Sequence, residues 1–277
     1  MGTAKQQHSE GWRASLNLAF EHRGNTTVLA ENRHQGPLMV QRPLYPEQKV
    51  CHVCILHPPG GVVGGDALHI ETSSEPHSHA LITTPGATKF YRSNGLTAHQ
   101  NTQLSINGGN LEWFPQDTIL FPGAHARIQT RVDLEQEGQF MGWEVVSLGL
   151  PTQNRAFDHG SLTNSFCLYR NNAPVFIDRL QIETADQLNS LTGLHGYPVN
   201  GLFLATNANQ SLVHKARESL PLLNGAMISV TLAGEILVAR YLGFSTFEAR
   251  TIFQHIWTSL RPALFNCEAC PPRIWTT

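Results

Sequence analysis

The stretch Trp12–His22, WRASLNLAFEH, decides the fold class because its apolar and polar residues alternate without a break. One face of the extended segment carries Trp12, Ala14, Leu16, Leu18 and Phe20, and the other carries Arg13, Ser15, Asn17 and Glu21. Alternation with a period of two is typical of a half-buried β-strand. Gly24 and Asn25 follow, and the β-branched residues of TTVLAE (26–31) suit a return strand. The pattern predicts a β-hairpin.

Short runs of the same kind continue along the chain, bounded by Gly, Pro, Asn or Asp. Examples are KVCHVCILH (49–57), ARIQTRVDL (126–134) and GWEVVSLGL (142–150). No helical segments alternate with these runs, which argues against βαβ units. We therefore expect a mainly β protein with an antiparallel or coiled architecture.

Two segments near the end of the sequence have helical spacing instead. From Phe247 to Leu260 the apolar residues recur at three- and four-residue intervals, after a capping-box pattern of Ser245 and Glu248. Pro262 is expected to end this helix, and a weaker helical run covers 211–220. The sequence contains no tandem repeat or linker, so we expect one domain over 1–277. Its first ten residues (1–10) should form a flexible tail, and a few short helices should lie in the C-terminal quarter.

The composition excludes several classes of function. Charged residues make up only 14% of the chain, the formal net charge is −2 and the pI is near 6.7. Such a balance offers no strong positive field for nucleic acid or anionic lipid. No run approaches the ~18 apolar residues that span a bilayer. We expect a cytoplasmic protein, and its low charge suggests a permanent partner.

The segment HPPGGVVGGD (57–66) is rich in glycine but does not match a phosphate-binding loop. The pattern GxxxxGK[ST] is absent, and a strand-like run follows instead of a helix. We interpret the segment as a tight reversal between strands, with glycine where φ is positive.

Cysteine and histidine patterns leave a second kind of site open. The sequence contains two Cys-x-x-Cys pairs, Cys51/Cys54 and Cys267/Cys270, nominally enough for a zinc site with four thiolate ligands. A separate pattern, His77-x-His79, could chelate nickel or zinc from one face of an extended chain. The alternatives are small buried thiols and an exposed polar turn. These residues support the alternative of a stand-alone His/Cys metallochaperone. A zinc hydrolase is disfavoured because no H-E-x-x-H or G-x-S-x-G signature occurs.

Three carboxylates lie at positions in the sequence that suggest a function. Asp66 ends the glycine-rich segment, whereas Glu144 and Asp178 interrupt strongly apolar strands. Acids in such places must be paired, hydrated or bound to cations. A salt bridge, for example from Asp178 to Arg179 or to an arginine elsewhere, is one interpretation. The other is a water-filled interior passage whose oxygens hold a divalent cation weakly.

Five longer blocks resemble the urease accessory protein UreD (UreH) family. They are QRPLYPE (41–47), LHPPGGVVGGD (56–66), TTPGATKFYRS (83–93), LEWFPQDTILFPGA (111–124) and the terminal PPRIWTT (271–277). The likeness runs from Gly11 onward and is weakest over about 186–224. The resemblance implies a large β-helix-like, coiled antiparallel scaffold with a small helical part. It also implies a non-enzymatic maturation factor that binds apo-urease and the partner UreF, and through UreF the GTPase UreG.

The resemblance also implies a role for particular residues. Family members are thought to conduct Ni2+ through an internal passage toward the urease dinickel site, with no tightly bound cofactor of their own. By motif position, the passage-lining residues are Asp66, Thr88, Glu144 and Asp178. A dimer of UreD–UreF heterodimers is the expected assembly.

Two blocks with aromatic and basic residues are candidates for partner binding. Aromatic residues and arginine are favoured at the centres of interfaces, although buried aromatics also dominate cores. The predicted partner-binding residues are Lys89, Tyr91, Arg92 and Trp113.

Overall fold

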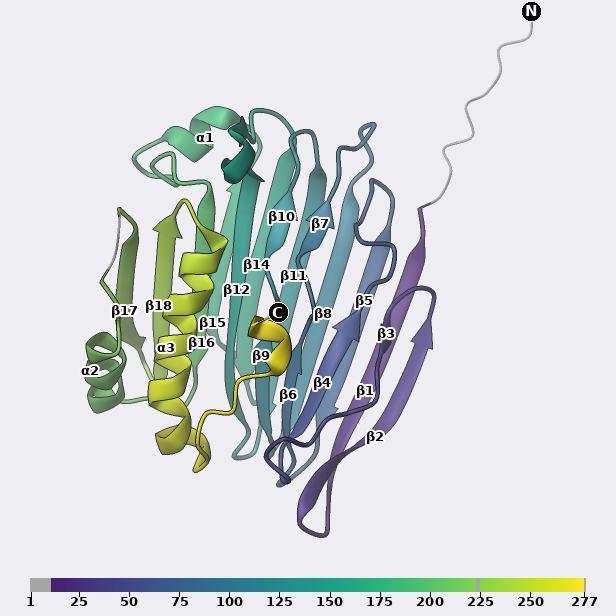
Figure 1. Cartoon of the computed structure of the whole chain (residues 1–277), viewed down its shortest axis with the longest axis vertical. Helices are drawn as coiled ribbons and strands as arrows, with labels where there is room; N and C mark the ends of the chain where they lie inside the picture. Colours follow the sequence, from purple (N-terminus) through teal and green to yellow (C-terminus); the bar gives the residue numbers. More distant parts are fainter. Residues whose placement is uncertain (1–10, 223–224, 277) are drawn as a thin grey trace, which may run out of the picture.

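The computed structural model describes residues 11–222 and 225–276, which form two β-sheets packed face to face (Figure 1). The smaller sheet has seven strands in the order β15-β14-β11-β8-β5-β1-β2. Its strands are β1 (Arg13–Arg23), β2 (Thr26–Gln35), β5 (Ala67–Ser74), β8 (Ala98–Asn107), β11 (His125–Glu135), β14 (Ser161–Arg170) and β15 (Ala173–Ile182).

The larger sheet has eleven strands, with β17-β18-β16-β12-β9-β6-β4-β3 as its main path and β7, β10 and β13 attached beside it. Its strands are β3 (Met39–Val40), β4 (Cys51–Leu56), β6 (His79–Thr83), β7 (Thr88–Phe90), β9 (Asn110–Phe114), β10 (Thr118–Leu120), β12 (Gln139–Leu150), β13 (Arg155–Ala156), β16 (Val199–Ala205), β17 (Met227–Ala233) and β18 (Ile236–Gly243).

The middle of the chain winds as a coil between the two sheets. Strands β5, β8, β11 and β14 lie in the smaller sheet, and β6, β9 and β12, which alternate with them along the chain, lie in the larger one. Within the coil, the strands that belong to the same sheet run in the same direction and pair in parallel. The pairs that flank the coil, β1–β2, β12–β16 and β14–β15, are antiparallel. The predicted mainly β class with late helices is confirmed, and the coil itself is parallel.

The predicted hairpin and both predicted helices are present. Strands β1 and β2 pair antiparallel, α2 covers Gln210–Glu218 and α3 covers Thr246–Phe265. A short α1 (Ala185–Asn189) and two 3-10 turns (Pro151–Gln153 and Arg273–Thr276) complete the structure. Within the described residues, no helix is long and apolar enough to cross a membrane.

The expected end of the last helix at Pro262 is wrong, because α3 continues for a further turn to Phe265. A proline within a helix costs ~3 kcal/mol because one backbone hydrogen bond is lost. Buried side chains on either side, Arg261 and Phe265, hold this turn against the larger sheet. The tertiary contacts outweigh the local penalty.

Two apolar layers hold the molecule together. The first fills the space between the sheets. The second lies between the larger sheet and the helices, where Trp257 and Phe253 of α3 pack with Phe114 and Trp143, and Trp275 of the C-terminal segment joins them. Strands β9 and β12 are consequently buried on both faces.

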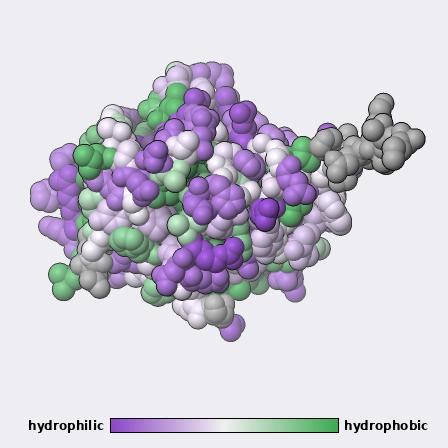
Figure 2. Space-filling view, turned by 90° about the horizontal axis from the view of Figure 1, so that it is seen from above, coloured by the Kyte–Doolittle hydropathy of each residue, from purple (hydrophilic) through white to green (hydrophobic). Residues whose placement is uncertain are grey.

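The two ends of the sandwich differ. Short polar turns at 75–78, 108–109, 136–138 and 171–172 connect the strands at one end, at the bottom of Figure 1. Loops at 57–66, 91–97, 121–124 and 157–160 connect them at the other end, and the first two of these loops are longer than any of the turns. Figure 2 looks down on the end with the longer loops, where apolar and hydrophilic surfaces are interleaved.

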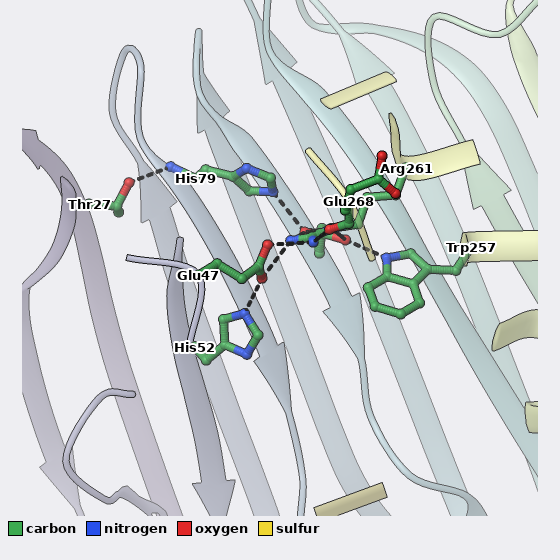
Figure 3. A network of polar contacts seen from close by, with 8 residues as sticks. Thr27, Glu47, His52, His79, Trp257, Arg261 and Glu268 are labelled. Carbon is green, nitrogen blue, oxygen red and sulfur yellow. Dashed lines mark hydrogen bonds and ion pairs between the residues drawn. The ribbon is translucent and has the colours of Figure 1, made fainter. Parts of the chain in front are cut away.

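A buried network of ionic groups ties α3 to the larger sheet (Figure 3). The guanidinium of Arg261, which is fully buried, donates to Glu112 of β9 (Nη2 to Oε1, 2.9 Å) and to Glu47 (Nη2 to Oε1, 2.9 Å). Each carboxylate also contacts a histidine: His79 Nε2 lies 2.7 Å from Glu112 Oε1, and His52 Nε2 lies 2.6 Å from Glu47 Oε1.

The balance of charge in this network favours the ionised forms. Burial alone would raise the pKa of Glu112, but the hydrogen bond and charge of His79, together with Arg261, outweigh it and lower the pKa to about 2. Burial disfavours the charged form of Arg261, yet the negative charge of Glu112 and the hydrogen bond to Glu47 raise its pKa. The network is therefore a set of mutually dependent buried charges.

Candidate functional site

A cavity of about 270 Å³ lies between the two sheets, toward the end with the longer loops. Its walls come from both sheets and from the loops that join them. Its polar lining residues include His57, Thr88, Gln100, Thr118, Glu144 and Asn164. A cavity of this size with polar groups in its lining has room for several water molecules, each of which needs at least ~10–15 Å³ of such space.

Glu144 is the acidic residue of this cavity. It lies on β12 between Trp143 and Val145, which face the helices, so its own side chain points into the space between the sheets. Thr130 of β11, in the opposite sheet, donates its hydroxyl to Glu144 Oε1 at 2.5 Å. The carboxylate therefore bridges the two sheets.

The surroundings of Glu144 make it a weak acid. Burial raises its pKa to about 7, the negative charge of Asp178 adds to this increase, and the hydrogen bond from Thr130 opposes it. Near neutral pH the side chain is therefore divided between its neutral and ionised forms. A cation that binds there must compete with a proton.

Asp178 lies close enough to influence Glu144 but does not line the cavity. Its Oδ1 accepts a hydrogen bond from Arg240 Nη2 at 2.7 Å, which joins β15 of one sheet to β18 of the other. Of the two partners that the sequence suggested for a salt bridge, Arg179 or an arginine elsewhere, the structure shows the second, Arg240. Asp178 is thus ion-paired beside the cavity.

Asp66 has a different role in the structure. It is 7% exposed, and its two carboxylate oxygens accept from the backbone N–H groups of Trp12 (2.8 Å) and Val63 (2.9 Å). It thereby fixes the glycine-rich segment, where Gly60 and Gly65 have positive φ values, as the predicted reversal requires. Its charge also reaches His57, which lines the cavity. Asp66 does not line the cavity itself.

Of the four predicted passage residues, the structure brings Thr88 and Glu144 together in the cavity and places Asp66 and Asp178 outside its lining. Sequence reasoning missed Gln100 and Asn164, which face the same cavity from the smaller sheet. The Oδ1 atom of Asn164 is buried and has no hydrogen-bond partner in the protein. An acceptor left in this way calls for a water molecule or an ion.

The cysteine pairs do not assemble into a zinc site. Within residues 11–222 and 225–276, no group of three or more His, Cys, Asp or Glu side chains could hold a metal ion. Burial raises the pKa of both Cys51 and Cys267 to about 11, so both thiols are protonated at neutral pH. A stand-alone His/Cys metallochaperone would need such a cluster.

Of the two interpretations of His77-x-His79, a chelating pair and an exposed polar turn, the structure shows the turn for His77 and no chelating pair. His77 belongs to an exposed turn with a φ of 65°, whereas His79 is buried at the start of β6 with its ring on Glu112. The chain is not extended through both residues, so the two imidazoles do not share a face. His77 lies beside His22 instead, with ring centroids 6.5 Å apart.

The four predicted partner-binding residues divide into two groups. Tyr91 and Arg92 are exposed, and Lys89 is half-buried at the edge of the cavity. Trp113 is a correction: it is 2% exposed, lies within the core and lines the cavity. The second apolar layer covers β9, so this block does not reach the surface.

Comparisons with known proteins identify the family of this chain. The chain matches the family described as UreD urease accessory protein over residues 12–276. It is 44% identical to the urease accessory protein UreD of Alcanivorax borkumensis over 274 residues, which cover 97% of this chain and 93% of that protein. The corresponding proteins of an Enterobacter species and of Pseudomonas putida strain W619 are 41% and 42% identical, over 100% and 99% of this chain and over 99% and 97% of their own length. The chain belongs to the UreD family of urease accessory proteins, which are non-enzymatic factors of urease maturation.

Proposed function

We propose that this protein conducts Ni2+ toward the nascent urease site through the cavity between its sheets. The observation that carries the proposal is the half-buried carboxylate of Glu144, which lines the cavity together with the oxygen-bearing side chains of Thr88, Gln100 and Asn164. Oxygen ligands hold Ni2+ less tightly than imidazole or thiolate clusters do. A cargo ion can therefore enter and leave, and no resident cofactor is required.

Membership of the UreD family supports a proposal for the partners. The protein binds apo-urease and UreF, and UreF brings the GTPase UreG, in a dimer of UreD–UreF heterodimers in the cytoplasm. The low charge content of the chain, 14%, supports such permanent association. Direction is supplied by the nucleotide-driven donor and by the tighter final site, because a passage of weak sites has no direction of its own.

Glu144→Ala tests the proposal. In cells that express urease and its accessory proteins at limiting nickel, we expect urease activity and nickel content to fall roughly tenfold, the equivalent of losing ~1.4 kcal/mol of cation stabilisation at one station. Thr88→Val should act in the same direction with a smaller effect. Glu71→Ala, on the exposed face of β5, is the matched control.

The assembly must be measured in the same samples. The variants should still co-purify with UreF and apo-urease at wild-type stoichiometry. If nickel content stays at the wild-type level in both cavity variants, the passage does not run past Glu144. If assembly is lost with activity, the carboxylate is structural.

A further inference from the structure

Two polar contacts cross the space between the sheets at the same level of the sandwich. Thr130 of β11 donates to Glu144 of β12 at 2.5 Å, and Arg240 of β18 donates to Asp178 of β15 at 2.7 Å. The strand registers place these contacts in one row, because only β14 separates β11 from β15 and only β16 separates β12 from β18. The second contact therefore lies two strands from the first.

A buried apolar pair fills the row between the two contacts. Phe166 of β14 pairs with Thr130 on one side and with Asp178 on the other. Leu202 of β16 has the corresponding place in the opposite sheet. Phe166 is 3% exposed, Leu202 is 8% exposed, and both belong to the core between the sheets. The two side chains exclude water from the row, and charges that act across such material are screened weakly.

Asp178 is the member of the ion pair whose charge reaches the cavity. Its negative charge contributes to the raised pKa of Glu144. Arg240 is the more exposed member, with 46% of its side chain accessible against 29% for Asp178, and its guanidinium lies 5.7 Å from the ring centroid of Phe176 on the edge strand β15. Arg240 therefore cancels part of the negative charge that Asp178 directs at the cavity.

We propose that Arg240 limits how tightly the cavity holds a divalent cation, because it partly neutralises Asp178 two strands away from Glu144. Neighbouring strands lie ~4.8 Å apart, so both charges are ~10 Å from an ion at Glu144. Over that distance, and at an effective dielectric constant of ~40, one unit charge changes the affinity for a divalent ion roughly tenfold. A passage must release its ion as well as bind it, and Arg240 prevents the ion from being trapped. The inference rests on the proposed function, because it concerns the same cavity.

The test is a titration with Ni2+ of the full chain in its complex with UreF, at about pH 8, where the carboxylate of Glu144 is mostly ionised. The binding that Glu144→Ala removes defines the contribution of the cavity. Asp178→Asn should weaken this binding roughly tenfold. Arg240→Gln should tighten it roughly fivefold, a smaller change because Arg240 is the more exposed partner. The double variant should return to within about twofold of the wild type, since both members of the pair are then neutral.

The opposite signs distinguish an effect of charge from a structural one. Loss of a structural contact would change the affinity of Arg240→Gln and Asp178→Asn in the same direction, and the double variant would not recover. Arg33→Gln is the matched control, because Arg33 also belongs to an exposed ion pair, with Glu31, on β2 at the opposite edge of the seven-stranded sheet. It should bind Ni2+ as the wild type does, and both single-variant shifts should shrink at high salt.

Two results would overturn the inference and leave the passage past Glu144 in place. One is wild-type or weaker binding of Ni2+ by Arg240→Gln, and the other is a shift of the same sign in Asp178→Asn. If Glu144→Ala binds Ni2+ as tightly as the wild type, the cavity holds no cation. That result would overturn the proposed function and this inference together.

Discussion

Arg261→Ala should destabilise the protein by about 3–5 kcal/mol, the usual consequence of removing one partner from a buried ion pair. The guanidinium is fully buried and serves two carboxylates, of which Glu112 is itself completely buried. Alanine leaves the negative charge of Glu112 with Trp257 and His79 as its partners. Because domains are stable by only ~5–15 kcal/mol, a loss of this size removes much of the stability.

The free energy of unfolding from urea titration is the measurement. Arg131→Ala is the matched control, since the Arg131–Asp133 pair is an ion pair on the exposed face of β11, with Arg131 45% exposed; its loss should cost less than ~1 kcal/mol. Adding Glu112→Gln to Arg261→Ala should restore part of the loss, because it removes the unpaired buried charge. An Arg261→Ala protein within ~1 kcal/mol of the wild type would mean that water reaches the network.

The sequence separation within this network explains why it was not predicted. Arg261 and Glu112 are 149 residues apart, and Arg261 and Glu47 are 214 apart. Each residue alone looks like an ordinary charge in an amphipathic segment. Their pairing depends on where α3 crosses the sheet, and periodicity carries no information about that crossing.

The alternation of apolar and polar residues predicted where the strands lie, but it did not predict whether neighbouring strands run parallel or antiparallel. The period of two in Trp12–His22 is the burial pattern of β1, and the turn at Gly24 is the observed hairpin. The same period occurs in parallel and antiparallel strands that are buried on one face. The coil is parallel because alternate strands go to different sheets, which is a property of the connections and not of any single strand.

The cavity residues could have been predicted from the phase of the alternation. In β8, Ala98 and Leu104 point inward, so Gln100 between them must also point inward; in β14 the same holds for Asn164 between Leu162 and Phe166. Polar residues at inward positions mark a wet interior. The burial of Trp113 was harder to predict, because β9 is buried on both faces and its sequence shows no alternation of apolar and polar residues.

The second large effect that we expect is a change in how stability depends on pH in Glu144→Gln. The pKa of Glu144 is raised from 4.5 to about 7, so the folded state binds the proton more tightly than the unfolded state does. Its stabilising contribution is complete below pH ~4.5 and is lost as the pH rises through about 7. At ~1.4 kcal/mol per pKa unit, the loss amounts to about 3 kcal/mol.

Glutamine is neutral at every pH, so the variant should lack this loss. Between about pH 5 and about pH 8, we expect the free energy of unfolding of the wild type to fall by ~2–3 kcal/mol more than that of Glu144→Gln. Glu71→Gln, on the exposed face of β5, is the control. An unchanged difference would mean that the carboxylate is ionised throughout and that solvent fills the cavity.

The raised pKa of Glu144 has a direct consequence for the cargo, because a proton held near neutral pH competes with Ni2+. Binding of Ni2+ to the wild-type complex should therefore tighten as the pH rises through about 7 and level off above it, and Glu144→Gln should abolish that dependence.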